Sequence, residues 1–139
     1  MPDLIRTSID LPAKLAEVFA YVADPATGPI VSSAKEVLDA TRDNGQVTSF
    51  ETKRGTVKYV TQASPHYLEG EYQQKRARTR YEIRCEAIGE ATTRVSIDVN
   101  IQPQSMRAKL SGPLPRLRAK LQLNDWREQA QQHFGPKKK

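Results

Sequence analysis

The first 25 residues change their hydrophobic period abruptly, and this change constrains the fold more than any other feature. Residues 5–9 alternate between apolar and polar side chains, as a half-buried strand does. One apolar helix face follows at i, i+3, i+4 and i+7: Leu15, Val18, Phe19 and Val22. Pro12 suits the first turn of that helix, and Asp24-Pro25 suits its end. The sequence therefore predicts a strand over 4–11 that leads directly into a helix over 13–23.

The sequence of the middle of the chain indicates a series of short strands separated by turns. Asp43-Asn44-Gly45 is a strong hairpin signal, because Asn and Gly tolerate a positive φ. The alternation predicts six strands, near residues 33–42, 46–54, 56–64, 67–75, 78–88 and 92–102. The last two have one apolar and one polar face, so the sheet is expected to be antiparallel and covered on one side. Helices must supply that cover.

A second helix is predicted to begin around 112–115. Its apolar residues form two stripes on nearly opposite sides: Leu114, Leu117 and Leu121 on one, and Ala119, Leu123, Trp126, Ala130 and Phe134 on the other. One sheet can bury only one side of a straight helix. Either the helix breaks or kinks near 122–125, with Trp126 still on the sheet, or one stripe is free for a partner. We expect Leu117 and Leu121 to face the sheet, and we favour the kinked helix that keeps Trp126 on the sheet as well. The alternative is a straight helix, which would leave Trp126 and Phe134 for a homodimer.

The early helix also carries a family resemblance. Pro12-Ala13, Glu17-Val18-Phe19, Tyr21-Val22 and Asp24-Pro25 resemble the amino-terminal signature of the polyketide cyclase, START-like and birch-pollen-allergen superfamily (SRPBCC). Thr93-Arg94-Val95 resembles its turn before the final strand. The resemblance implies an α+β helix-grip fold, in which a curved antiparallel sheet wraps around a long C-terminal helix. Residues 26–31 depart from the pattern, so the short helix that helps to close the cavity is expected to be brief or absent.

The resemblance also implies a function. Members hold apolar or amphipathic small molecules between sheet and helix, so we expect binding or transport of a lipid- or polyketide-like molecule there. The residues whose side chains are predicted to point inward form the expected wall of the pocket: Phe50, Tyr59, Leu68, Tyr72, Tyr81, Ile83, Ile97, Leu117 and Leu121. A solid core made by the same residues is the alternative. The tyrosines favour a pocket, because each buried hydroxyl needs a polar partner.

Catalysis has little support in the sequence. His66, in a turn, is the single candidate for acid–base chemistry. No His/Cys spacing fits a metal site, and no glycine-rich phosphate loop occurs. The sequence therefore predicts no catalytic residue, metal or cofactor. A polyketide cyclase- or dehydratase-like enzyme and a module that docks on proteins or membranes stay open as alternative functions.

Charge and cysteine content bound the partners and the compartment. The net charge is +6, and 15 of the 22 Lys and Arg residues follow residue 60, against 8 acidic residues there. Such a basic half attracts anionic lipid or nucleic acid at long range. No nucleic-acid motif or interleaved aromatics accompany it, so we expect no nucleic acid and keep a membrane surface as an alternative. Cys85 is the only cysteine, and with no secretory-type start the expected compartment is cytoplasmic. One domain is expected over 1–134, with a basic tail at 135–139.

Overall fold

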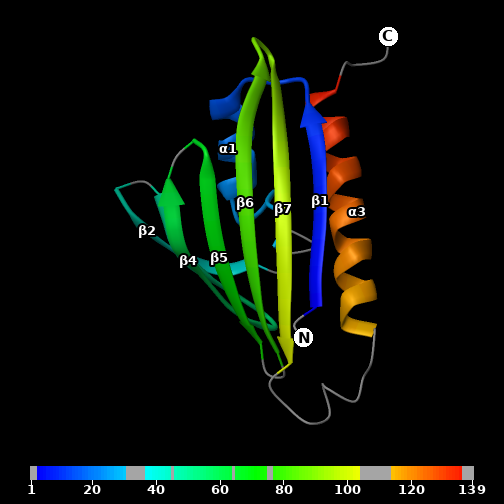
Figure 1. Cartoon of the computed structure of the whole chain (residues 1–139). Coiled ribbons are helices and arrows are strands. Elements are labelled where there is room, and N and C mark those ends of the chain that lie inside the picture. The colour runs from blue at the N-terminus through cyan, green and yellow to red at the C-terminus, as the bar shows by residue number, and fades with distance from the viewer. Residues whose placement is uncertain are drawn as a thin grey trace.

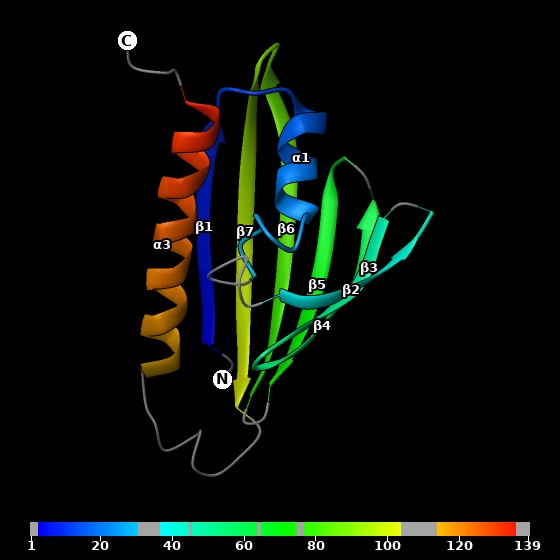
Figure 2. The same ribbon diagram turned by 180° about the vertical axis from the view of Figure 1, so that it is seen from behind.

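The computed structural model describes residues 3–30, 37–44, 46–63, 65–74, 77–103 and 114–135. They form one antiparallel sheet with both helices on the same side of it (Figures 1 and 2). The elements are β1 (Asp3–Leu11), α1 (Leu15–Ala23), β2 (Val37–Asp43), β3 (Gln46–Thr52), β4 (Gly55–Ala63), β5 (Tyr67–Gln74), β6 (Ala77–Gly89), β7 (Thr92–Pro103) and α3 (Leu114–Phe134). Residues 33–36 of the predicted strand over 33–42, and residues 136–139 of the predicted tail, lie outside the described residues.

The seven strands follow the order β1-β7-β6-β5-β4-β3-β2. From β2 to β7 each strand pairs with the next along the chain, and β1 then adds to β7, which brings the first and the last strand together. Asn44 has a φ of 53° in the turn between β2 and β3, as the Asp-Asn-Gly signal predicts. Figure 2 shows the sheet curving from β7 towards β2, around the side that carries the helices. The predicted curved antiparallel sheet is confirmed.

The early helix begins two residues later than predicted. Ala13 donates its backbone N–H to the carbonyl of Leu11, at 2.8 Å, and accepts a hydrogen bond from the Thr93 hydroxyl, also at 2.8 Å. These bonds hold Ala13 in a tight turn, so that the helix starts at Leu15. Its buried face consists of Val18, Phe19 and Val22, as the periodicity predicts.

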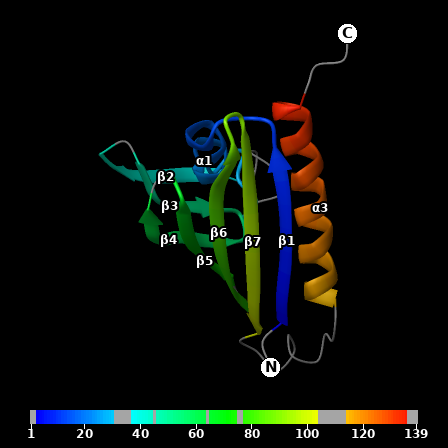
Figure 3. The ribbon, with the colours of Figure 1, turned by 45° about the horizontal axis from the view of Figure 1, so that its top comes forward.

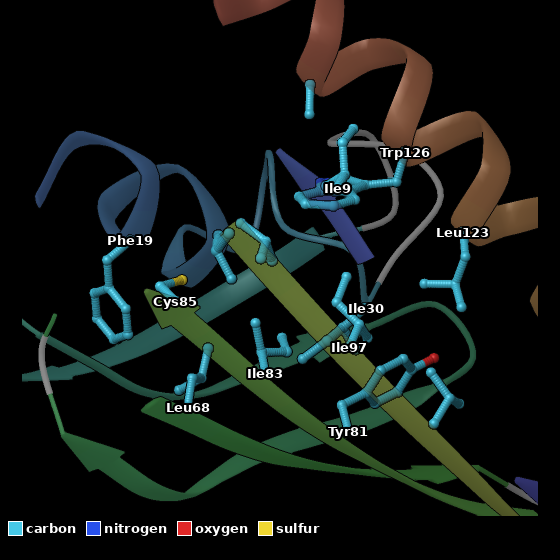
Figure 4. Close-up of a cluster of buried hydrophobic side chains, with 14 of the residues drawn as sticks. Ile9, Phe19, Ile30, Leu68, Tyr81, Ile83, Cys85, Ile97, Leu123 and Trp126 are labelled. Atoms are coloured by element: carbon cyan, nitrogen blue, oxygen red, sulfur yellow. The ribbon is translucent and has the colours of Figure 1, made fainter. Parts of the chain in front are cut away.

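The late helix is continuous from Leu114 to Phe134, and the break considered near 122–125 does not occur. It packs on β1 and β7 through the second of its two stripes. Leu123 and Trp126 are each 3% exposed and Ala130 is fully buried, whereas Leu117 and Leu121 are 54% and 56% exposed. The prediction that Leu117 and Leu121 face the sheet is wrong. Figure 4 shows Leu123 and Trp126 pointing from α3 into the buried cluster.

The segment after α1 is fastened to α3 by side-chain hydrogen bonds. The Trp126 indole N–H donates to the carbonyl of Thr27 at 2.8 Å, and the Gln122 amide donates to the carbonyls of Pro29 and Ile30 at 2.9 Å. Ile30 then packs directly over Gly70, where a Cβ would lie only 2.9 Å from the Ile30 Cδ1 atom. Residues 24–30 form turns, and residues 31–36, over which a short helix could extend, lie outside the described residues.

The two faces of the sheet differ as the alternation of the last strands predicts. Ile83 and Ile97 are fully buried and Tyr81 is 6% exposed on the face that carries the helices. The opposite face carries ion pairs, such as Arg80 with Glu69 and Arg84 with Asp98. These pairs are half exposed and contribute little stability individually. They keep the outer face solvated.

Candidate functional site

Seven of the predicted wall residues gather in the interior, but they form a packed core. They are Phe50, Tyr59, Leu68, Tyr72, Tyr81, Ile83 and Ile97, and each belongs to the core cluster or packs against it. Leu68, Ile83 and Ile97 have no exposed surface (Figure 4). The remaining two predicted wall residues, Leu117 and Leu121, lie on the outer side of α3 and contribute to no wall. The burial of these seven residues fits the alternative of a solid core, and a ligand wall made by them stays a prediction.

Two of the three tyrosines bond within the protein. The hydroxyl of Tyr59 donates to the carbonyl of Ala23 at 2.8 Å, which ties β4 to the end of α1. The hydroxyls of Tyr72 and Thr52 lie 2.6 Å apart in the core. Burial raises the pKa of Tyr59 and of Tyr81 well above the usual value for tyrosine, so both hydroxyls stay neutral. The hydroxyls of Tyr59 and Tyr72 therefore find their polar partners within the protein.

A cleft of about 300 Å³ lies elsewhere, between α1 and the end of the sheet formed by β2, β3 and β4. Figure 3 shows where these elements lie in the fold. We call it the α1 cleft. Its lining residues are Ala16, Phe19, Ala20, Ala23, Asp24, Arg42, Gln46, Val47 and Gln62. Their side chains divide into an apolar group from α1 and β3 and a polar group of one acid, one cation and two amides. Polar atoms supply more of the accessible lining than apolar atoms do, so the cleft is more polar than the usual small-molecule site.

Three strand irregularities shape this end of the sheet. The register shifts leave Leu38, Thr48 and Val60 without a residue opposite them in the ladder. A bulge reverses which face the following side chains occupy. On β3 the bulge at Thr48 places Val47 on the buried side, the same side as Phe50. On β4 the bulge at Val60 places Gln62 across from Leu68, whose side chain points inward. The Gln62 amide donates to the carbonyl of Val47 at 3.1 Å, so the bulged strands hold the cleft wall together.

Opposite charges line the α1 cleft. The Asp24 carboxylate follows the last turn of α1 and accepts a hydrogen bond from the backbone N–H of Ala26 at 2.9 Å. Arg42 comes from β2 and forms no ion pair with a residue that the structure describes. Both charges act on the nearby hydroxyl of Tyr59, whose pKa Asp24 raises and Arg42 lowers, after the larger effect of burial. Arg42 is thus a cation available to a ligand.

Other chemistry has little structural basis. Within the described ranges no three His, Cys, Asp or Glu side chains gather as a metal site would require. Cys85 is buried, and burial raises the pKa of its thiol to about 12, which makes it a poor nucleophile. His66 is exposed in its turn and does not line the α1 cleft. No helix in the described part of the chain is long and apolar enough to cross a membrane.

The residues of the α1 cleft were not predicted from sequence, although part of a signal existed. The Asp-Asn-Gly turn predicts that Arg42 and Gln46 approach each other where β2 and β3 meet. The bulges have no comparable signature, because Thr48 and Val60 are ordinary strand residues. Gln62 was therefore not recognised as inward-facing.

Comparison with known proteins gives the fold and nothing finer. No family model matches the sequence, and no curated protein matches it either. Among solved structures, the chain is similar to an HSP90 activator from Plasmodium falciparum, with a TM-score of 0.70, 14% identity, and coverage of 97% of this chain and 99% of that one. It is similar to the Zhui aromatase/cyclase from Streptomyces sp. R1128, with a TM-score of 0.65, 10% identity and 96% coverage of both chains. A START superfamily protein from Mycobacterium smegmatis has a TM-score of 0.63, 13% identity, and coverage of 94% and 98%.

The chain has the helix-grip fold. The order of elements typical of this fold extends over nearly the whole chain. The residues on which the resemblance rests, such as Phe19 and Val22, are packing residues of that fold. The three solved structures carry different descriptions, and identities of 10–14% transfer no activity to this chain. Function must therefore be argued from the α1 cleft.

Proposed function

We propose that this helix-grip protein binds a small amphipathic molecule in the α1 cleft. The observation that carries the proposal is the composition of the cleft, in which Phe19 and Val47 offer apolar surface and Arg42 and Gln62 offer polar contacts. A volume of about 300 Å³ is at the lower end of the range for small-molecule sites. The expected ligand is therefore small and has one apolar part and one polar end. A long lipid chain exceeds this volume.

The polar end of the ligand should be an acceptor of hydrogen bonds. Arg42 presents several N–H donors in a planar fork, and Gln46 and Gln62 add amide groups. A carboxylate or a ketone oxygen can accept from these donors. Asp24, on the opposite wall, accepts a hydrogen bond from a hydroxyl or ammonium group. A molecule with an oxygen acceptor at one end and a hydroxyl at the other fits both walls.

A cleft-filling substitution tests the proposal. Ala20 is exposed on α1 and lines the cleft, so Ala20→Trp should fill it without disturbing the core. Glu17 is exposed on the same helix but does not line the cleft, so Glu17→Trp is the matched control. Binding of an anilinonaphthalene sulfonate dye is measured by fluorescence titration, and native mass spectrometry detects any co-purified molecule. We expect Ala20→Trp to weaken dye binding by about tenfold or more and Glu17→Trp to leave it unchanged. Equal binding by both variants contradicts the proposal.

Catalysis in the same cleft is the second candidate, because Asp24 is an acid and Arg42 is a cation on facing walls. A carboxylate can take a proton from carbon next to a carbonyl while a guanidinium stabilises the developing oxyanion. The test compares the molecules recovered from the parent protein and from Asp24→Asn. A product that is lighter by one water, recovered only from the parent, indicates cyclisation with dehydration. The same molecule from both proteins indicates binding alone.

A further inference from the structure

The outer side of α3 carries an apolar surface that the fold leaves uncovered. Leu117 and Leu121 are 54% and 56% exposed, while Trp126 of the same helix is buried at 3%. Residues four positions apart are neighbours on a helix surface, so the two leucines form one patch. Exposing two leucines on a helix that has another stripe for its core serves no purpose in packing.

Cations flank this patch. Arg118 and Lys120 are exposed, and neither forms an ion pair with a residue in the described part of the chain. We call Leu117, Arg118, Lys120 and Leu121 the basic leucine patch. On the outer sheet face, by contrast, arginines such as Arg80 and Arg84 are paired with Glu and Asp. Arg118 and Lys120 thus differ from the paired arginines of the outer sheet face, and among the described residues they share this lack of an ion pair with other exposed cations such as Lys53 and Lys58.

The sequence around the patch is basic. No acidic residue occurs between Asp98 and Asp125, and five cations lie in that interval: Arg107, Lys109, Arg116, Arg118 and Lys120. Further along α3 the exposed residues include Asp125 and Glu128. The patch is thus limited to the first turns of the helix. An anionic surface would attract these turns and repel the part of the helix that carries Asp125 and Glu128.

We propose that the basic leucine patch docks on the surface of an anionic phospholipid bilayer. The leucines would enter the boundary between headgroups and acyl chains, and Arg118 and Lys120 would contact the phosphates. Apolar side chains beside cations suit such a surface, which offers both an apolar boundary and anionic phosphates. Two exposed leucines provide far less area than the roughly 800 Å² per partner of a stable protein interface. A nucleic acid would favour aromatic side chains for stacking, and the patch has none.

The proposed docking is reversible and sensitive to salt. Two leucines and a few cations give weak anchoring, and the attraction between exposed charges and lipid phosphates decreases as salt screens it. It is independent of the α1 cleft, which lies at the opposite end of the sheet, beside β2, β3 and β4. Filling the cleft with Ala20→Trp should leave membrane docking unchanged.

Vesicle flotation tests the proposal with the full chain. The vesicles consist of phosphatidylcholine alone or with about one third phosphatidylglycerol, each at low and high salt. We expect flotation only with the anionic vesicles at low salt. Arg118→Gln/Lys120→Gln should reduce partitioning about 25-fold, because each charge near such a surface is worth about fivefold. Leu117→Gln/Leu121→Gln should reduce it about tenfold or more.

Two matched variants serve as controls. Lys53→Gln/Lys58→Gln removes the same charge from exposed positions on β3–β4, and Leu38→Gln/Val60→Gln removes exposed apolar side chains from β2 and β4. Both should float like the parent. Thermal melts verify that all four variants fold. Absence of flotation with anionic vesicles, or equal losses in the controls, overturns the proposal. So does retention of a labelled DNA duplex by a protein that no vesicle binds.

Discussion

The two halves of the sheet have similar strand sequences but different roles. In one half, β1 pairs with β7 over residues 3–11 without a register shift, β5 pairs with β6 equally regularly, and β6 and β7 shift register only once, at Ile88 near their hairpin. In the other half, β2, β3 and β4 contain the bulged residues Leu38, Thr48 and Val60. The regular half buries its apolar residues under both helices, with α3 on β1 and β7 and α1 on β6 and β7, and the bulged half forms one wall of the α1 cleft. Regular pairing gives stability, and local irregularity turns polar side chains inward.

The largest expected effect tests how α3 grips the regular half. Trp126→Ala removes a buried aromatic side chain and its hydrogen bond to the Thr27 carbonyl. We expect the free energy of unfolding to decrease by about 3–5 kcal/mol. Leu117→Ala, on the exposed side of the same helix, should change it by less than about 0.5 kcal/mol. Urea denaturation measures both, and a larger loss for Leu117→Ala would mean that the outer stripe packs after all.

The next prediction compares the two halves directly. Ile97 is fully buried on β7, whereas Val60 is a bulged residue of β4 and 55% exposed. Ile97→Ala should reduce the free energy of unfolding by about 2–5 kcal/mol, because it leaves a cavity under the helices. Val60→Ala should have little effect. Similar losses in chemical denaturation would show that the bulged half is packed as tightly as the regular one.

A smaller effect is expected within the bulged half, at the turn between β3 and β4. The Thr52 hydroxyl accepts hydrogen bonds from the backbone N–H groups of Arg54 and Gly55, each at 3.1 Å, and lies beside the Tyr72 hydroxyl. Thr52→Val keeps the shape but removes these bonds, so we expect a loss of about 1–3 kcal/mol. Thr48→Val, at an exposed bulge, is the control and should be nearly neutral. Calorimetric melts that show no difference between the two would refute a role for this network.

The smallest effect concerns alkaline pH. Burial raises the pKa of the Cys85 thiol from 9.0 to about 12, so the folded protein retains the thiol proton at a pH where the unfolded chain has lost it. Stability is therefore complete below about pH 9 and falls as the pH rises towards 12. Between pH 8 and pH 10 the expected loss from this group is about 1 kcal/mol. Cys85→Ala should show a correspondingly shallower decline in pH-dependent urea denaturation, and identical slopes would contradict the burial of the thiol.

Much of the fold could be predicted from the sequence, because the positions of its strands and helices depend on local hydrophobic periodicity. The change of period near Pro12 predicted the order of β1 and α1, and the alternation in 78–102 predicted β6 and β7 with their buried faces. The candidate site was not accessible in the same way. Of the nine predicted wall residues, seven are core and two are solvent-exposed, and none lines the α1 cleft. A strict alternation cannot represent a bulge, which shifts every later side chain to the other face.

The prediction of a homodimer through Trp126 and Phe134 assumed that their stripe would be exposed. In the structure Trp126 is part of the core, and Phe134 packs against it while its ring meets that of Tyr21 edge-on at 5.0 Å. The surface on which that dimer depended is therefore not available, and the partner now proposed for α3 lies on its other side.

The sequence alone determined where strands and helices form, because the periods of 2 and 3.6 are properties of the local backbone. It also determined that α3 has two apolar stripes. Only the tertiary structure decided between them. Trp126 offers more buried area than a leucine and an N–H group that reaches the Thr27 carbonyl, 99 residues away in the chain. That bond exists only once α1, the segment after it and α3 are packed together, so no local pattern can encode it.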